Sequence, residues 1–451
     1  MEREKPITPR KAWIFIMLVL ICAGSSTAAW KNWPFAAGFI PGLLFLLGIA
    51  HSRGMRWTDL KASALRGIRQ IEDVIWLLPL IGLLIPSWMA CGVIPFLMDF
   101  GIAAIYPKLF LASAFVITLI TSMLLGTTLG TLSVIGIPVI GIAQALNIPV
   151  PMVAGALVSG AVVGDRSSPL SGTFNMLAAA VGITPREHFK ALFPTGIMGL
   201  LAALVFFLAI DWTLQGANLQ VENILSLAEY FTLSPVLLLA PLVLIVGIGL
   251  RMRIRNAFLG GIAVSILLAV FLQGVNPELL LSYMLKGYSG PGPAFLHSTG
   301  FIAMLPMTLF VIEIGAFNGV LMDSGLVDPY IKNLLGSRPS LPSYTWRAMG
   351  FGILLDVLTC NQSLPVVLSG SSLRPIWSQQ FNASHLSRVV ADSVQLAAAL
   401  VPWNLMAVLI STVIGVRVWD YLSYAAYIWS LPLISLAYSF YLAQSKQGVQ
   451  A

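Results

Sequence analysis

Charged residues are scarce in this chain: only 10% of its 451 residues are Asp, Glu, Lys or Arg, whereas 58% are hydrophobic. So little polar surface cannot cover a water-soluble globule of this size, and a mean hydropathy of +0.88 leads to the same conclusion. Uncharged runs that contain 35–50 and 74–85 lengthen to the roughly 20 residues that cross about 30 Å of hydrocarbon. The composition therefore excludes a large soluble protein and predicts an all-α polytopic membrane protein.

Cysteine and histidine are rare, with three and four copies, and their placement excludes several kinds of site. Cys22, Cys91 and Cys360 lie inside apolar runs without ligand-like spacing, so neither a disulfide framework nor a metal cluster is predicted. The histidines form no paired zinc motif. The chain also lacks an HExxH helix, a GxSxG elbow and a Walker loop, which argues against an intramembrane enzyme and against ATP binding. We expect no cofactor.

The formal charge of +7 comes from basic residues between apolar segments, a pattern that indicates membrane topology and not nucleic-acid binding. Basic residues precede the first apolar run, and a second apolar run follows it directly, so we expect 12–30 to be a retained span and not a cleaved signal. The basic stretch 51–73 then predicts a cytoplasmic amino terminus in a bacterial inner membrane. Basic loops 186–190, 251–255 and 338–347 are expected inside, and the acidic stretch 211–229 outside.

Hydropathy predicts nine full spans and two interrupted apolar regions, or about 10–12 transmembrane helices in all. The full spans are 12–30, 34–50, 71–93, 106–125, 191–211, 233–250, 256–274, 300–321 and 418–441. Regions 126–183 and 348–415 are apolar but are punctuated by Gly, Pro, Ser, Thr and Asn. Backbone leaves the helix at membrane depth only where protein or a water-filled cavity satisfies it, so discontinuous or re-entrant helices in these regions are expected to line a substrate site.

The two interrupted regions have similar layouts. Asp165 lies ten residues before Asn175-Met-Leu-Ala, and Asp392 lies twelve residues before Asn404-Leu-Met-Ala. This similarity predicts a weak internal repeat, of the inverted kind found in secondary transporters. We expect an N-terminal span at 1–30, a first repeat at 31–230 and a second repeat at 231–451.

Asp165 and Asp392 are the candidate ion-binding groups, because a carboxylate in hydrocarbon is costly unless it is paired, hydrated or protonated. Neighbouring hydroxyl and amide oxygens are expected to complete a shell for a small cation such as Na+. One carboxylate can hold a proton or a transient Na+ but not both, and this competition is an antiport mechanism. The shell candidates are Thr127, Thr128, Ser168, Ser171, Thr173, Asn175, Asn361, Gln362, Ser363 and Asn404.

Other interpretations remain open for the charged residues. In a purely structural role, Asp165 would pair with the adjacent Arg166, or Asp392 with the nearby Arg388, as a buried salt bridge that fixes a helix end. Glu313 and Asp356 also lie inside apolar runs. Each is interpreted either as a proton relay or as a hydrogen-bond partner of a neighbouring helix. A channel is a further alternative, but paired discontinuous helices with single acids fit an occluded site better than an open pore.

Six stretches of the chain match the signature pattern of a known family. They are 136–142, 154–160 and 164–171 in the first interrupted region, 386–393 and 401–404 in the second, and 317–326. They resemble the NhaC-type Na+/H+ antiporter family, a branch of the wider ion transporter superfamily, and the resemblance covers most of the chain. It implies two inverted repeats with broken helices, a scaffold domain, a moving transport domain, a homodimer, and Na+ and H+ as the transported ions.

The chain departs from that family pattern at three positions. Gly172 stands where the family usually has an acidic residue, Phe174 where it has threonine, and Ala391 where it has glutamate. Relatives in this group exchange small organic acids, such as malate against lactate. The alternative function is therefore H+- or Na+-coupled transport of a small organic acid or amino acid, with Arg166 or Arg388 binding a substrate carboxylate. Glu313 would then supply the lost proton site.

Overall fold

The computed structural model describes residues 11–31, 33–104, 107–214, 227–250, 252–292, 296–326 and 340–445, in which all regular secondary structure is helical. Seven of the described helices are long and apolar enough to cross a membrane, or eight if one bent pair is a single span. Four shorter apolar helices accompany them. These features confirm an all-α, multi-pass membrane protein. Parts of the charged stretches lie outside the described residues: 1–10, 251 and 338–339 from the basic stretches, and 215–226 from the acidic stretch.

Each predicted span overlaps mainly with one α-helix. These helices are α1 (Lys11–Trp30), α2 (Phe35–Ser52), α4 (Glu72–Ala90), α6 (Phe110–Leu125), α11 (Pro185–Leu214), α13 (Leu239–Gly249), α14 (Ile254–Phe271), α16 (Phe301–Asp323) and α24 (Ala426–Gln444). Their lengths differ: α13 has 11 residues and α11 has 30. The last predicted span began too early, because 418–424 belongs to a bent segment. There α22 (Leu405–Ile414) ends at Gly415, whose φ is +68°, and meets α23 (Val418–Tyr421) at 88°.

The basic stretch that was expected to be a loop forms the amphipathic helix α3 (Trp57–Gln70). Leu60, Ser63 and Gly67 are its buried residues, and its basic side chains lie on the other faces. Two further helices, α5 (Val93–Ala104) and α15 (Pro277–Lys286), were not predicted as separate elements.

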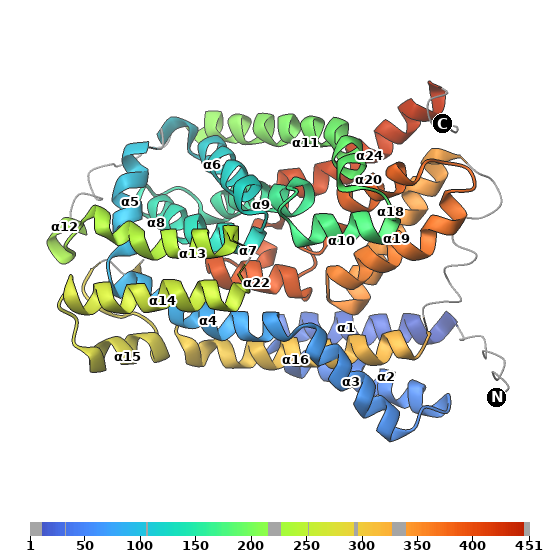
Figure 1. Cartoon of the computed structure of the whole chain (residues 1–451), viewed down its shortest axis with the longest axis horizontal. Coiled ribbons are helices and arrows are strands. Elements are labelled where there is room, and N and C mark those ends of the chain that lie inside the picture. Colours follow the sequence, from blue (N-terminus) through green and yellow to red (C-terminus); the bar gives the residue numbers. More distant parts are fainter. Residues whose placement is uncertain are drawn as a thin grey trace.

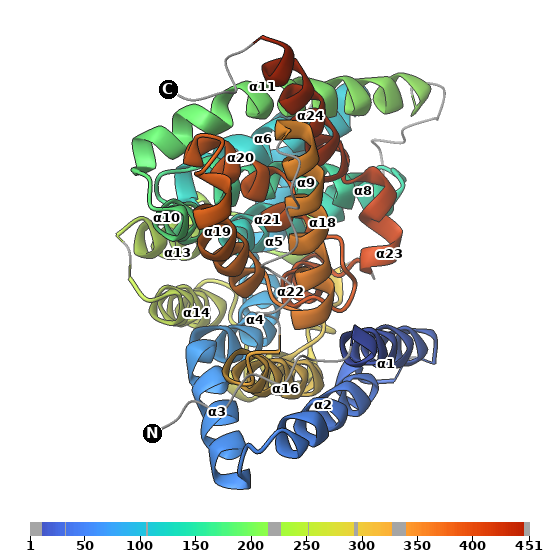
Figure 2. The same cartoon turned by 90° about the vertical axis from the view of Figure 1, so that its right-hand side faces the viewer.

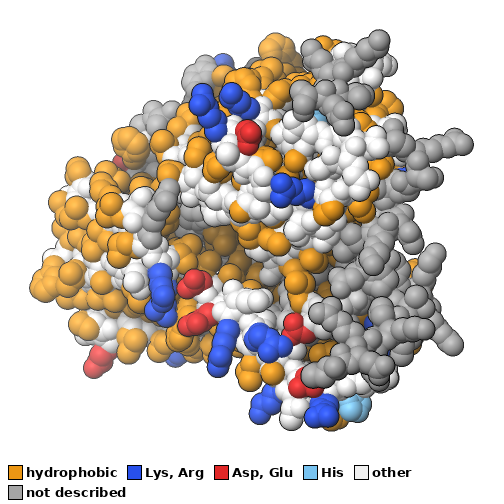
Figure 3. Space-filling model, turned by 45° about the vertical axis from the view of Figure 1, so that its right-hand side comes forward, with side chains coloured by type: hydrophobic (Ala, Val, Ile, Leu, Met, Phe, Trp, Pro, Cys, Tyr) orange, Lys and Arg blue, Asp and Glu red, His pale blue; other side chains and the backbone are white. Residues whose placement is uncertain are grey.

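The helices form two groups with the interrupted segments between them. Figures 1 and 2 show α1, α2, α3 and α16 together on one side of the molecule, and α6, α11, α20 (Ala383–Asp392) and α24 on the other. The helices α10 (Gly172–Val181), α19 (Ser363–Trp377) and α22 lie between the two groups. Hydrophobic side chains cover much of the surface in Figure 3, as a lipid-facing exterior requires.

Both interrupted regions contain a helix that stops at a left-handed residue and resumes after a short gap. In the first region α6 ends at Gly126 (φ +67°), and Thr127 caps α7 (Thr128–Thr131), which continues through a π-helical turn into α8 (Ile137–Ala145). In the second region α18 (Leu341–Thr359) ends at Cys360 (φ +53°), before α19. A further gap separates α9 (Val150–Ser167) from α10, and another separates α21 (Val394–Ala397) from α22.

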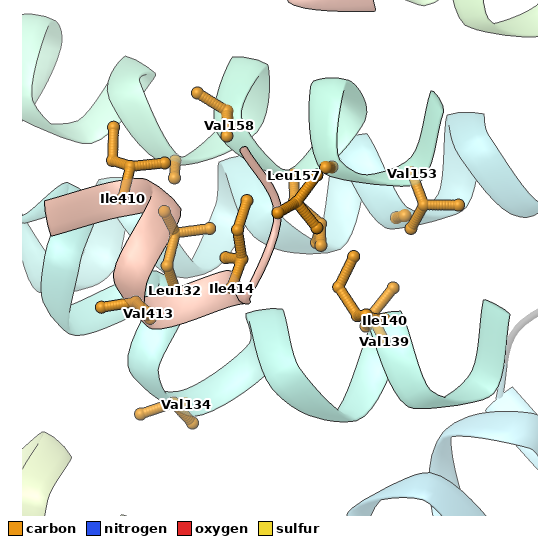
Figure 4. Packing of buried hydrophobic residues seen from close by; sticks show 14 of the residues in the cluster. Leu132, Val134, Val139, Ile140, Val153, Leu157, Val158, Ile410, Val413 and Ile414 are labelled. Carbon is orange, nitrogen blue, oxygen red and sulfur yellow. The ribbon is translucent and has the colours of Figure 1, made fainter. Parts of the chain in front are cut away.

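The two interrupted regions pack directly against each other. Figure 4 shows Ile410, Val413 and Ile414 of α22 beside Leu132 and beside Leu157 of α9, all within one buried hydrophobic cluster. The second region therefore shares its core with the first, although the two are far apart in the sequence.

Close packing of α3 on α16 depends on glycine, and this gives a first testable prediction. A methyl group on Gly67 would lie 2.6 Å from the Gly319 nitrogen, so the Gly67→Ala variant must separate the two helices. We expect a loss of about 1–3 kcal/mol of stability, seen as a lower melting temperature in detergent. The matched control is Gly350→Ala on α18, where an added methyl meets nothing within 4 Å. Equal melting temperatures for the two variants would contradict this packing.

Candidate functional site

A cavity of about 530 Å³ lies between α3 and α16 on one side and the interrupted helices on the other. It brings together predicted residues from both interrupted regions. Asp165, Thr127 and Thr173 come from the first, and Asn361, Gln362 and Ser363 come from the second. Helices α3 and α16 add two polar residues that the sequence interpretation missed, Gln70 and Asn318.

Asp165 is the acidic residue in the cavity wall. Its Oδ2 accepts hydrogen bonds from the Thr128 backbone N–H at 3.2 Å and from the Thr128 hydroxyl. Its Oδ1 lies 3.4 Å from the hydroxyl oxygens of both Ser171 and Thr173. Hydroxyl groups donate and accept, so this shell can hold an ionised carboxylate, a protonated acid, or a cation bound by the same oxygens.

Helix amino ends also line this cavity. The first turns of α10, α19 and α22 contribute to the cavity wall through Thr173, Ser363 and Leu405. The amino end of a helix carries unpaired N–H groups and a partial positive charge, which stabilises a nearby anion. The helix breaks thus place an acid and three helix amino ends in the wall of one cavity.

Asp392 lies outside the cavity and forms a buried ion pair with Arg166. Its Oδ1 accepts from Arg166 Nε at 2.9 Å and from Nη2 at 2.5 Å, and both side chains are at most 1% exposed. Arg166 also donates to the Ser167 hydroxyl, the Leu192 carbonyl and the Thr195 hydroxyl. In the described residues, neither local pair considered from the sequence is an ion pair. Arg166 instead joins the two interrupted regions across 226 residues.

Gln395 links the backbone of Asp165 to Gln362 in the cavity wall. Its Nε2 donates to the Asp165 backbone carbonyl at 2.8 Å, and the Gln395 backbone carbonyl accepts from Gln362 Nε2 at 2.7 Å. The sequence interpretation missed Gln395. The available signal was an amide side chain inside the apolar segment Val394–Ala397, three residues after Asp392, and the structure shows that this side chain is buried.

Several of the other predicted ligands hold the helix breaks and do not line the cavity. Ser168 donates to the Met123 carbonyl at 2.8 Å, and Asn175 is exposed and donates to the Pro169 and Ser171 carbonyls. Asn404 caps α22 by accepting from the Met406 N–H at 3.0 Å, and it donates to the Asp356 carbonyl. Ser171 both contacts Asp165 and caps α10 through the Phe174 N–H.

Glu313 and Asp356 lie away from the wall of this cavity. Asp356 is fully buried near the end of α18, and neither of its carboxyl oxygens has a hydrogen-bond partner among the described residues. Glu313 is half-buried on α16, with Oε2 also unpartnered there. Of the three departures from the family pattern, Phe174 and Ala391 are fully buried, whereas Gly172 faces open space.

Taken together, a multi-pass helical fold and a carboxylate-containing cavity between interrupted helices define a membrane transporter of the secondary type. The chain belongs to the Na+/H+ antiporter family, whose sequence profile matches residues 212–441, just over half of the chain. It is therefore a transporter and not an enzyme.

Individual relatives match over most of their length. The chain is 28% identical to the Na+/H+ antiporter NhaC of Alkalihalophilus pseudofirmus, over 85% of each chain. It is 25% identical to the malate-2H+/Na+-lactate antiporter of Bacillus subtilis, over 85% of this chain and 83% of the relative. It is 28% identical to the arginine/ornithine antiporter ArcD of Halobacterium salinarum, over 82% of this chain and 79% of the relative.

Proposed function

We propose that this protein is a secondary active transporter that exchanges Na+ for H+ at Asp165. The observation that carries the proposal is the cavity itself: its wall holds one carboxylate with hydroxyl and amide groups, and its described lining residues include no Lys, Arg or His. A cation suits such a wall, because its carboxylate, hydroxyl and side-chain amide groups all offer oxygen ligands. The names of the NhaC relative and of the family support the same ions.

The mechanism follows from competition for one group. With a proton on Asp165, the carboxyl is neutral and Na+ loses its only charged ligand in the described wall. With Na+ bound, the site carries no spare negative charge for a proton. Thr127, Thr128, Ser171 and Thr173 are proposed to reorient between these two states, and Asn361, Gln362 and Ser363 to complete the shell from the second region. Each time the site moves from one side of the membrane to the other, it then carries either H+ or Na+.

A second candidate is exchange of a small organic solute coupled to H+ or Na+. A cavity of about 530 Å³ is larger than a single cation needs, and two relatives are named for organic solutes. An anionic substrate would lack a cationic side chain here, because Arg166 is paired with Asp392 and Arg388 lies elsewhere. A cationic or zwitterionic solute fits the wall better.

Proteoliposomes containing the purified protein separate the two candidates. A Na+ pulse should dissipate an imposed pH gradient, read with a pH-sensitive dye, in the absence of any metabolite. A response that requires malate, lactate, arginine or ornithine would overturn Na+/H+ exchange and support the second candidate. A K+ pulse of equal ionic strength is the control for charge and osmotic effects.

We further propose the arrangement that was expected from the sequence. The chain lies in the bacterial inner membrane with its amino terminus in the cytoplasm, as the basic residues of α3 and of the first turns of α11 favour. Residues 31–230 and 231–451 are proposed as inverted repeats, supported by the matching helix stops at Gly126 and Cys360. The working unit is proposed to be a homodimer.

A further inference from the structure

A second cavity, of about 350 Å³, lies between the start of α11, the turn before α20, and α24. It shares no lining residue with the Asp165 cavity. Its polar lining residues include Glu187, Lys190, Ser384, His385 and Arg388, so cationic groups outnumber acidic ones. We call it the Arg388 pocket. The Na+/H+ proposal assigns it no role.

Arg388 forms the buried floor of this pocket. Its side chain is 1% exposed, and its guanidinium donates to the Ser439 hydroxyl at 2.9 Å and lies 4.7 Å from the centre of the Tyr438 ring. Its Nε has no hydrogen-bond partner among the described residues. A buried charged donor without an acceptor is costly, so the guanidinium beside the pocket has unused hydrogen-bonding capacity.

Charge is also unbalanced around this arginine. Arg388 lies one helical turn before Asp392 on α20, but the Asp392 carboxylate is already held by Arg166. Two buried guanidinium groups thus share one buried carboxylate, and the surplus positive charge needs a counter-ion. Glu187, the acid among the described lining residues, is on the exposed rim, where its carboxylate accepts from the Thr184 N–H and hydroxyl at 2.8 Å each.

The remaining lining groups also favour an anion. The ten-residue helix α20 begins at the pocket, with Ser384 and His385 in its first turn. The Asn382 side chain caps the Ser384 N–H at 2.9 Å, so this helix end favours an oxyanion through its partial positive charge. Lys190 adds an exposed cation at the rim. A buried planar guanidinium, a rim ammonium and a helix amino end together match the oxygens of a phosphate group.

We propose that the Arg388 pocket binds a phosphate-type oxyanion, either a free anion or the headgroup phosphate of an anionic lipid. The ligand neutralises the surplus charge of the Arg166, Asp392 and Arg388 cluster. Because that cluster joins α9 to α20, the bound anion stabilises the contact between the two interrupted regions. This site is independent of ion exchange at Asp165.

Thermal unfolding of the purified full-length protein tests the proposal in two arms. In the first, inorganic phosphate is titrated against chloride at constant ionic strength. In the second, phosphatidylglycerol replaces phosphatidylcholine in nanodiscs without phosphate. We expect at least one ligand to raise the melting temperature in proportion to the logarithm of its concentration. A rise with phosphate alone identifies a free anion, and a rise with phosphatidylglycerol alone identifies a headgroup.

Two variants locate the effect. Arg388→Gln should weaken the apparent affinity for the stabilising ligand about tenfold or more, because a charge-assisted contact is lost. Arg186→Gln removes the same charge from an exposed residue in the first turn of α11, next to Glu187 but not lining the pocket, and it should respond like wild type. If Arg388→Gln does not fold, Lys190→Gln on the rim is the second variant and should also bind more weakly.

The proposal is wrong if neither phosphate nor phosphatidylglycerol raises the melting temperature above the chloride or phosphatidylcholine reference. It is also wrong if Arg388→Gln and Arg186→Gln respond alike. Na+-driven proton movement by Arg388→Gln is measured in parallel. That signal reports the Asp165 site, so failure at one site is distinguishable from failure at the other.

Discussion

The Asp165→Asn variant is expected to lose Na+-driven proton movement completely, falling to the rate of protein-free liposomes. Asparagine keeps the size of the side chain and an oxygen that can accept from Thr128, so the helix break and its hydrogen bonds persist. It cannot take up a proton or offer a negative charge to Na+, so neither half of the exchange remains. Size-exclusion profile and melting temperature should stay close to those of wild type.

The matched control for Asp165→Asn is Asp420→Asn. Asp420 forms an exposed ion pair with Arg417 at 3.0 Å, and such surface pairs contribute little. Its replacement makes the same chemical change outside the cavity and should leave exchange intact. Undiminished exchange by Asp165→Asn would show that the ion-binding carboxylate lies elsewhere, with Asp356 and Glu313 the next residues to replace.

The Asp392→Asn variant is expected to be strongly destabilised, by about 3–5 kcal/mol, because it breaks a buried ion pair and leaves an uncompensated charge. The Arg166→Gln variant should lose less. It leaves Asp392 with Arg388 one turn away, whereas Asp392→Asn leaves two buried guanidinium groups without a carboxylate. Melting temperatures of purified protein should therefore fall in the order wild type, Arg166→Gln, Asp392→Asn.

A double variant separates charge from packing in this pair. Replacing both residues, as Arg166→Met with Asp392→Leu, should destabilise less than the sum of the two single changes, since no unpaired partner is left from the pair. The prediction also distinguishes anchoring from ion binding. A stable Asp392→Asn protein that has lost Na+ exchange would mean that Asp392 handles ions, contrary to its position outside the cavity.

Hydropathy located most of the membrane helices because lipid forces each span to be apolar and to satisfy its own backbone. Interruptions such as Gly126-Thr127 and Cys360-Asn361-Gln362 were visible for the same reason, since small and polar residues are conspicuous in an apolar run. The amphipathic helix α3 was mistaken for a loop because its charged residues hide a narrow buried face. Its role in the cavity wall was therefore missed, together with Gln70.

An all-helical membrane transporter with acids at two helix interruptions could be predicted from the amino-acid sequence alone. Those properties depend on local composition and on the properties of lipid. The packing of the helices was needed to show that Asp165 faces a cavity while Asp392 is paired with Arg166. It was also needed to place Asn318 in the cavity wall and Gln395 beside Asp165. Side-chain partners more than 200 residues apart are chosen by how the helices pack, and short-range sequence patterns carry no record of that choice.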